Sequence, residues 1–208
     1  MHSFKFNWVK VRGIFFLSIL GALSFSCVKQ ESQTTDFSFT HVDSLTETYL
    51  TLQDSMLHTW NVMVKDENEK LQNIDLLLVE LLLNDVYNKE QILSLQQRLD
   101  QLERIRFNQK SMINQHVVEE YDFASNSLVT EVISFVESNL GFVQNQKLQQ
   151  MTDLIKLADQ RVSNYREEYD KVIILFNVFA EKNSNDLKEI DKNWESIAKP
   201  TFSDQEEK

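Results

Sequence analysis

Residues 148–179, LQQMTDLIKLADQRVSNYREEYDKVIILFNVF, carry the pattern that decides the fold. Apolar side chains recur every three or four positions along this stretch, a period that places them in one stripe on a helix, as in a coiled coil. The pattern predicts a long helix from about residue 145 to 183 that packs against other helices. Its stripe consists of Leu148, Met151, Ile155, Ala158, Val162, Tyr165, Tyr169, Val172, Phe176 and Phe179.

An equally long helix is predicted from about residue 41 to 84. Its apolar rhythm resumes one residue late after the charged run 65–69, a shift that changes supercoiling without ending a helix. The stripe consists of Val42, Leu45, Tyr49, Leu52, Met56, Met63, Leu71, Ile74, Leu78 and Leu81, with Trp60 one step beside it.

A third helix is predicted between these two, with an apolar stripe from Ile92 to Phe135. Asn88 is suited to cap its start, and Gly141 to take the left-handed conformation after its end. After the last long helix, Ser184 either caps a short fourth helix or the long helix continues to about residue 198.

Short turns make successive helices antiparallel, so that facing positions have a constant sum. The residue numbers of facing positions add to about 173 for the first and second helices and to about 283 for the second and third. These two registers place apolar residues opposite apolar residues along most of both pairs, as in Leu78 with Leu95 and Leu128 with Ile155. The sequence therefore predicts an all-α fold, an elongated antiparallel three-helix bundle with coiled-coil-like heptads over residues 41–198. The 208 residues include only 3 glycines and 1 proline, which fits long helices with few turns.

The first 26 residues have the pattern of a signal peptide. Lys5, Lys10 and Arg12 precede an apolar run of about 13 residues, which is shorter than the ~20 that a membrane-spanning helix needs. The run ends in Leu23-Ser24-Phe25-Ser26-Cys27, and Cys27 is the only cysteine. An uncleaved transmembrane anchor and a soluble secreted product are the alternatives to the interpretation that follows.

This ending resembles a bacterial lipobox, in which the cysteine becomes the lipidated first residue of the mature chain. The resemblance implies cleavage between Ser26 and Cys27 and acyl chains on Cys27 that attach the protein lastingly to a membrane. We expect an exported lipoprotein on the periplasmic face or the cell surface. Residues 27–40 are predicted to form a flexible tether, and residues 199–208 a disordered acidic tail.

Charge and motifs exclude several classes of function. Without the leader, which holds three of the 21 Lys+Arg and none of the 32 Asp+Glu, the net charge is 18 − 32 = −14, a field that repels nucleic acid. Helical bundles that bind two metal ions use Glu-x-x-His pairs, whereas His116 and Glu119 form a single motif in the reverse order, His-x-x-Glu. His41 and His58 have no second ligand at the spacing of a zinc site. We therefore predict that the protein has no catalytic residue, binds no metal or cofactor, and is not an enzyme.

The tetrapeptide Glu-Glu-Tyr-Asp occurs twice, at 119–122 and 167–170. The predicted register places Tyr121 opposite Val162. We therefore expect the two copies to lie apart, each with its tyrosine at the edge of the core and its acids in solvent.

The second copy belongs to the pattern Arg166-x-x-Tyr169-Asp170, followed by Phe176-Asn177, and Trp60 upstream leads into a leucine-rich segment. Together they resemble the LemA family, membrane-attached helical bundles with an extracytoplasmic body. The family's Arg-x-x-Tyr-Asn…Tyr-Asn signature would map to these five residues, with Asp in place of the first Asn and Phe in place of the second Tyr. The Phe-Pro that usually follows is absent.

These observations predict a non-enzymatic, membrane-anchored lipoprotein that acts as a scaffold or docks an unknown envelope protein. Trp194 and Ile197 form the expected partner surface if no groove receives them, and the heptads would also allow a homo-oligomer. The alternative is a ligand- or client-binding, chaperone-like module with a cavity or splayed helix end lined by Leu76, Leu83 and Phe142.

Overall fold

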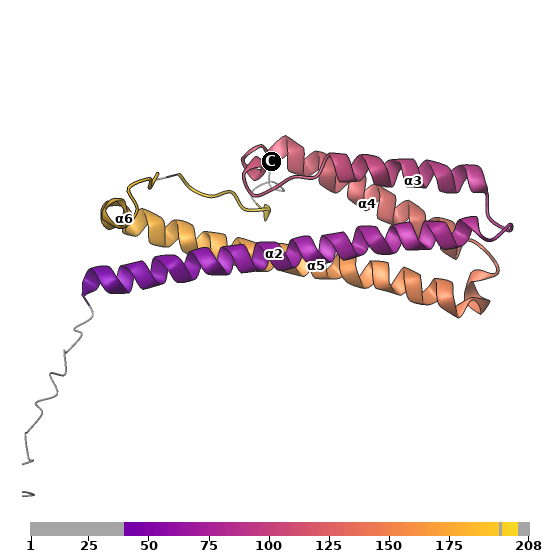
Figure 1. Cartoon of the computed structure of the whole chain (residues 1–208), viewed down its shortest axis with the longest axis horizontal. Helices are drawn as coiled ribbons and strands as arrows, with labels where there is room; N and C mark the ends of the chain where they lie inside the picture. The colour runs from indigo at the N-terminus through magenta and orange to yellow at the C-terminus, as the bar shows by residue number, and fades with distance from the viewer. Residues whose placement is uncertain (1–39, 196, 204–208) are drawn as a thin grey trace, which may run out of the picture. The chain divides into compact units, whose positions relative to one another are not determined.

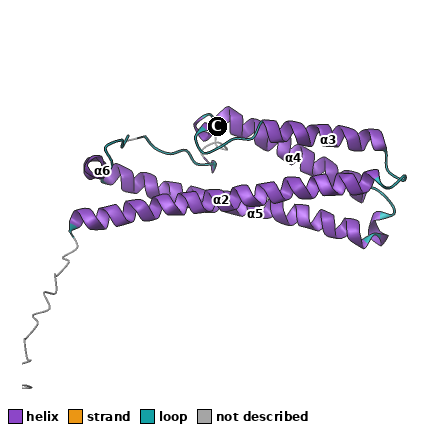
Figure 2. Cartoon of the chain, in the orientation of Figure 1, coloured by secondary structure: helices purple, strands orange, loops and turns teal. Residues whose placement is uncertain are grey.

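The computed structural model describes residues 40–195 and 197–203, which are helical with no strand among them (Figure 2). The predicted signal peptide, the cleavage site at Ser26 and Cys27, and nearly all of the predicted tether lie outside the described residues. No helix in the described part combines the length and the apolar character that crossing a membrane requires.

The first long helix is confirmed as α2, His41–Leu82, whose 42 residues span about 63 Å. Thr40 and Asp43 begin it with a reciprocal capping box. The Thr40 backbone N–H donates to the Asp43 carboxylate at 2.9 Å, and the Asp43 N–H donates to the Thr40 hydroxyl at 3.2 Å. The charged run 65–69 lies within α2 and does not end it.

The single helix predicted between residues 88 and 139 is wrong, because two helices take its place. Asn88 caps α3, Lys89–Arg104, as expected, but the chain then turns through a short 3₁₀ helix, Ser111–Ile113, into α4, Gln115–Glu137. Figure 1 shows α4 running back alongside α3. Arg98 of α3 pairs with Glu131 of α4 and donates to Ser127 Oγ at 3.0 Å, which confirms the antiparallel contact.

Local hydrogen bonds explain the break. The Asn108 side chain accepts from the backbone N–H groups of Lys110 and Ser111 at 2.9 and 3.1 Å, and the Ser111 hydroxyl accepts from the Asn108 N–H at 2.8 Å. Such side-chain bonds compete with the helical hydrogen-bond ladder. The turn also brings Phe107 against Trp60 and Tyr121, with ring centroids 6.0 and 5.3 Å away.

The last long helix is confirmed as α5, Gln146–Lys182, with the Asn145 side chain accepting from the Leu148 N–H. It does not continue to 198. A short helix, α6, spans Ser184–Ile190. Ser184 is the first residue of this helix and not its cap, and no side chain forms a capping hydrogen bond there. Gly141 also differs from expectation: its φ of −75° is right-handed, because α4 ends earlier and a second 3₁₀ turn, Phe142–Gln144, follows.

The helices α2 and α5 pack antiparallel along their length, while α3 and α4 cover only the half of this pair that ends at the α2–α3 turn (Figure 1). The C-terminal strap, which we define as residues 197–203, covers part of the other half. Thr201 and Phe202 are buried, with Phe202 7% exposed. The expectation of a disordered tail is therefore wrong for residues 199–203, and residues 204–208 lie outside the described part.

Two apolar clusters form the core, and buried charges separate them on α2. One cluster contains Leu71, Ile74, Leu78 and Leu81, and the other contains Tyr49, Met56, Trp60 and Met63. Between them Asp66, Glu67 and Lys70 are all buried. The charged run that shifts the heptad rhythm thus enters the core.

Candidate functional site

Lys70 is the centre of the buried charges, with 3% of its side chain exposed. Its ammonium lies 3.0 Å from Glu67 Oε2 on the same helix and 3.1 Å from Asp159 Oδ1 on α5. It also donates to Ser125 Oγ on α4 at 3.1 Å. One cation thereby joins three helices, and a buried charge is tolerated because oxygen atoms surround it.

The other oxygen of Glu67 accepts a hydrogen bond from the Tyr121 hydroxyl. Burial, and secondly the nearby Glu67 carboxylate, raise the pKa of Tyr121 far above its ordinary value. Tyr121 therefore stays protonated and serves as a fixed donor. The contact also corrects the predicted register, in which Tyr121 would face Leu52. The observed partners are instead separated by a nearly constant number of positions, 54 between Glu67 and Tyr121 and 55 between Lys70 and Ser125. A constant difference in residue number means that α2 and α4 are parallel.

Arg166 of α5 and Asp122 of α4 form a bidentate pair. Nη1 and Nη2 lie 2.7 and 2.6 Å from the two carboxylate oxygens. Burial by itself would lower the pKa of Arg166, but the hydrogen bonds and the charge of Asp122 outweigh it and raise that pKa. The guanidinium also lies 4.8 Å from the centre of the Phe202 ring. Arg166 thus connects α4, α5 and the C-terminal strap.

Asp170, one helical turn beyond Arg166, holds the strap by its backbone. Its two carboxylate oxygens accept from the N–H groups of Phe202 and Ser203 at 2.7 and 2.8 Å. Further along α5, the Asn177 side chain exchanges two hydrogen bonds with the Lys199 backbone, at 2.8 and 2.9 Å. The strap is therefore held by charge-assisted and paired hydrogen bonds.

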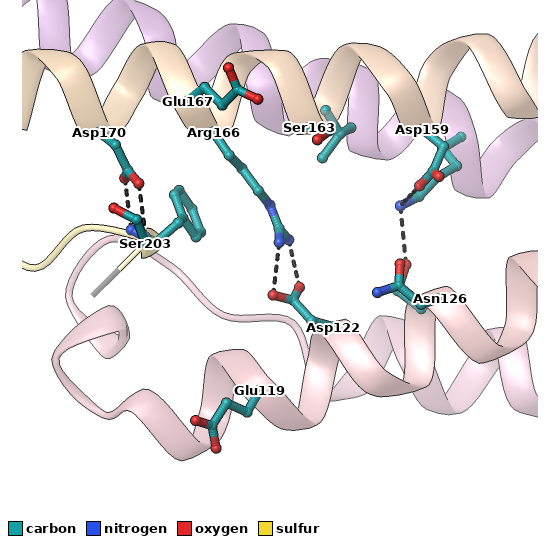
Figure 3. Close-up of a pocket in the computed structure, with 13 residues that line it drawn as sticks. Glu119, Asp122, Asn126, Asp159, Ser163, Arg166, Glu167, Asp170 and Ser203 are labelled. Carbon is teal, nitrogen blue, oxygen red and sulfur yellow. Dashed lines mark hydrogen bonds and ion pairs between the residues drawn. The ribbon is translucent and has the colours of Figure 1, made fainter. Parts of the chain in front are cut away.

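These residues enclose a polar cleft of about 640 Å³ between α4, α5 and the strap (Figure 3). Five carboxylates and two cations line it. The carboxylates include the first Glu and the Asp of both Glu-Glu-Tyr-Asp copies: Glu119, Asp122, Glu167 and Asp170.

The expectation that the two tetrapeptides lie apart is therefore wrong, since both line one cleft. Their four glutamates are exposed, as expected, whereas Asp122 is half-buried and Asp170 is buried. Positions i and i+3 share one helix face, and the break after α3 turns that face of α4 toward α5. Tyr121 and Tyr169 are both buried, and burial raises the pKa of Tyr169 as well. A sequence repeat thus becomes a spatial pair across one cleft.

The chemistry of the cleft is that of a polar binding surface. Serine hydroxyls line it beside the charged groups, and no histidine or cysteine belongs to its lining. Within the described ranges, no group of three or more His, Cys, Asp and Glu side chains could hold a metal ion. His116 is exposed, and the neighbouring Glu119 accepts from Gln115 Nε2 at 2.7 Å.

Trp194 and Ile197, the predicted partner surface, have different surroundings. Trp194 packs against Tyr49 and Phe176, with ring centroids at 5.9 and 6.1 Å, so a groove does receive it. Ile197 is 64% exposed. Cys27, the predicted lipidation site, lies outside the described residues.

Sequence reasoning missed seven residues of the cleft lining, among them Lys70, Asp159 and Phe202. The available signal was the charged run that interrupts the stripe of α2, since charges at stripe positions must be paired if the helix stays buried. Phe202 gave no periodic signal. Comparison of the chain with protein-family models, curated proteins and solved structures finds no match.

Proposed function

We propose that this chain is a non-enzymatic bacterial lipoprotein with a LemA-like helical body, anchored to a membrane by lipid on Cys27. Its helical body docks a protein of the cell envelope, on the periplasmic face or at the cell surface. The signal-like leader and the lipobox-like ending support export and anchoring.

Four exposed apolar side chains at one end of the bundle (Figure 1) carry the docking proposal. Leu83 and Val86 lie in the α2–α3 turn, and Leu140 and Val143 in the α4–α5 turn, each 72 to 96% exposed. Both turns lie at the same end of the bundle, one length of α2 away from Thr40 (Figure 1). Exposed apolar side chains gathered in one region can mark an interaction site, and we call these four residues the apolar end.

The anchor is tested by labelling cells with radioactive palmitate. The wild-type chain should take up label and Cys27→Ser should not. Equal labelling of the two, or no labelling of the wild type, contradicts lipidation at Cys27.

Docking is tested with a photo-crosslinking amino acid placed at Val86 or Val143 in intact cells. We expect one discrete crosslinked protein from either position. Gln97 is the matched control, because it is exposed on the surface of α3 away from the turns. Crosslinks of equal yield from Gln97, or self-crosslinks only, contradict docking through the apolar end, and self-crosslinks indicate a homo-oligomer instead.

The polar cleft favours a second candidate function, a ligand-binding helical module. The cavity lies among Lys70, Asp122 and Arg166, and not at Leu76, Leu83 and Phe142, where the sequence suggested it. Native mass spectrometry of the protein purified from its cells should show a retained molecule that Glu119→Gln/Glu167→Gln loses. If the wild type retains nothing, this candidate fails and the docking proposal is unaffected.

A further inference from the structure

A second cavity, of about 260 Å³, shares Val162 and Arg166 with the polar cleft but has apolar walls. Trp60, Met63 and Val64 come from α2, Phe107 from the segment after α3, and Tyr121 from α4. We call it the aromatic pocket. Its volume is slightly below the ~300 Å³ at which pockets for drug-sized ligands begin, so it suits a body of one or two rings.

The aromatic rings meet edge to face. Phe107 is tilted by 68° to Trp60 and by 81° to Tyr121. Aromatic pairs prefer edge-to-face or offset-stacked contact, and a further flat ring among these three can contact them in the same ways. The walls therefore favour a flat apolar body.

Of the charged side chains that line the pocket, some have a partner of opposite charge and one does not. Glu67 lies beside Lys70 and accepts from Tyr121, and Arg166 is paired with Asp122. Arg106 is exposed, and its Nη2 donates a hydrogen bond to the Asn68 amide oxygen at 2.6 Å. None of the ion pairs found among residues 40–195 and 197–203 includes Arg106. The unmatched charge of the pocket is thus positive.

We propose that the aromatic pocket binds a small aromatic carboxylate. The ring system lies among Trp60, Phe107 and Tyr121, and the carboxylate pairs with the Arg106 guanidinium, whose planar fork suits two carboxylate oxygens. The negative charge of the whole body opposes an approaching anion, but salt screens it beyond about 8 Å under physiological conditions, whereas a direct ion pair is much shorter. This proposal does not depend on docking through the apolar end.

Tryptophan fluorescence provides the test, because Trp60 lines the pocket. The chain has three tryptophans, so Trp8→Phe/Trp194→Phe leaves Trp60 as the single reporter in the full-length protein. The probe is 2-naphthoate, and 2-naphthamide is its neutral counterpart of similar shape. All titrations use the same detergent, and circular dichroism melting checks that each variant is folded.

We expect both probes to change Trp60 emission and naphthoate to bind more tightly. Arg106→Gln should weaken naphthoate about tenfold and leave naphthamide unchanged. Arg104→Gln is the matched control, since Arg104 is an exposed cation two residues away that does not line the pocket, and it should change neither affinity. Val64→Phe should fill the cavity and abolish both signals, with Val64→Leu as the milder variant if Phe is not tolerated.

Absence of any response to naphthoate at millimolar concentration overturns the proposal. So does an equal loss from Arg104→Gln and Arg106→Gln, which would show general electrostatic attraction. Retention of full naphthoate affinity in a folded Val64→Phe or Val64→Leu protein would place the binding elsewhere and also overturn it.

Discussion

Lys70 carries a charge at the centre of the bundle, where three oxygen atoms surround it. Removing an ion from water costs several kcal/mol, and pairing within the protein roughly offsets that cost. Such a group contributes little net stability, but its loss leaves a charge without a partner. Because Lys70 joins α2, α4 and α5, we infer that it selects one alignment of these helices among those that the apolar stripes allow.

Lys70→Met should therefore destabilise the protein by about 3 kcal/mol, since Glu67 loses its cation in a buried site. Glu67→Gln/Lys70→Met should recover more than half of this loss. Urea unfolding at pH 7, followed by circular dichroism, measures both. Lys89→Met is the control, because the Lys89–Asp85 pair is exposed and its loss should cost less than about 1 kcal/mol. Equal effects of Lys70→Met and Lys89→Met would contradict this view of Lys70.

Tyr121 predicts how stability depends on alkaline pH. Its raised pKa means that the folded protein keeps the phenol proton, whereas the unfolded chain loses it near pH 10. Stability from the neutral phenol is therefore complete below about pH 10 and falls above it, by at most ~1.4 kcal/mol per pH unit for one proton. Tyr121→Phe should be less stable at pH 8, because Glu67 loses a donor, but should show a shallower fall from pH 10 to 11 in urea unfolding. Parallel curves for the two proteins would contradict this assignment.

At the scale of elements, the C-terminal strap replaces the missing half of the α3–α4 layer. The ring of Phe202 stacks on Trp60 at a centroid distance of 6.4 Å and an angle of 6°, and it meets Tyr169 edge to face at 5.7 Å. Asp170 fixes the backbone on either side of that ring position. A segment without regular structure thereby completes the second apolar cluster.

Phe202→Ala should cost about 3 kcal/mol, the low end for removing a buried phenylalanine. Ile197→Ala, in the same strap but mostly exposed, should cost less than about 0.5 kcal/mol. Thermal unfolding of both variants against the wild type gives the comparison. If the two substitutions have the same small effect, the strap is not part of the cooperative fold.

At the scale of the whole helical body, the reversal of the chain after α3 is the main architectural result. It places α4 parallel to α2 and antiparallel to α3, so that α2, α3, α4 and α5 share one half of the body (Figure 1). One uninterrupted helix would instead carry residue 131 about 50 Å beyond residue 98, at 1.5 Å per residue.

A crosslink distinguishes these two arrangements. With Cys27→Ser removing the only cysteine, Arg98→Cys and Glu131→Cys should be joined within one chain by a short bismaleimide, because the native side chains are in contact. Mass spectrometry of the linked peptides identifies the product, and a mixture of the two single-cysteine proteins controls for links between chains. Failure to crosslink in the folded double variant would favour the uninterrupted helix.

Much of the fold could be predicted because heptad periodicity is a local property. The bounds of α2 and α5 follow from stripes that run for many turns, and Asn88 is a cap recognisable from its place before a stripe. The break at Asn108 was missed because apolar residues continue on both sides of it. The antiparallel register predicted for the start of this helix was therefore applied beyond the turn as well. It assigned Tyr121 the wrong partner on α2, where the structure pairs it with Glu67.

The sequence by itself determined the helical class, the positions of the two longest helices and the expectation of a lipid-anchored export product, because each depends on neighbouring residues. Only the tertiary structure decided that the two Glu-Glu-Tyr-Asp copies line one cleft, that Lys70 is buried and that Phe202 closes the core. The physical reason is that these contacts join positions 32 to 142 residues apart, and a repeat along one helix does not state which face of another helix it will meet.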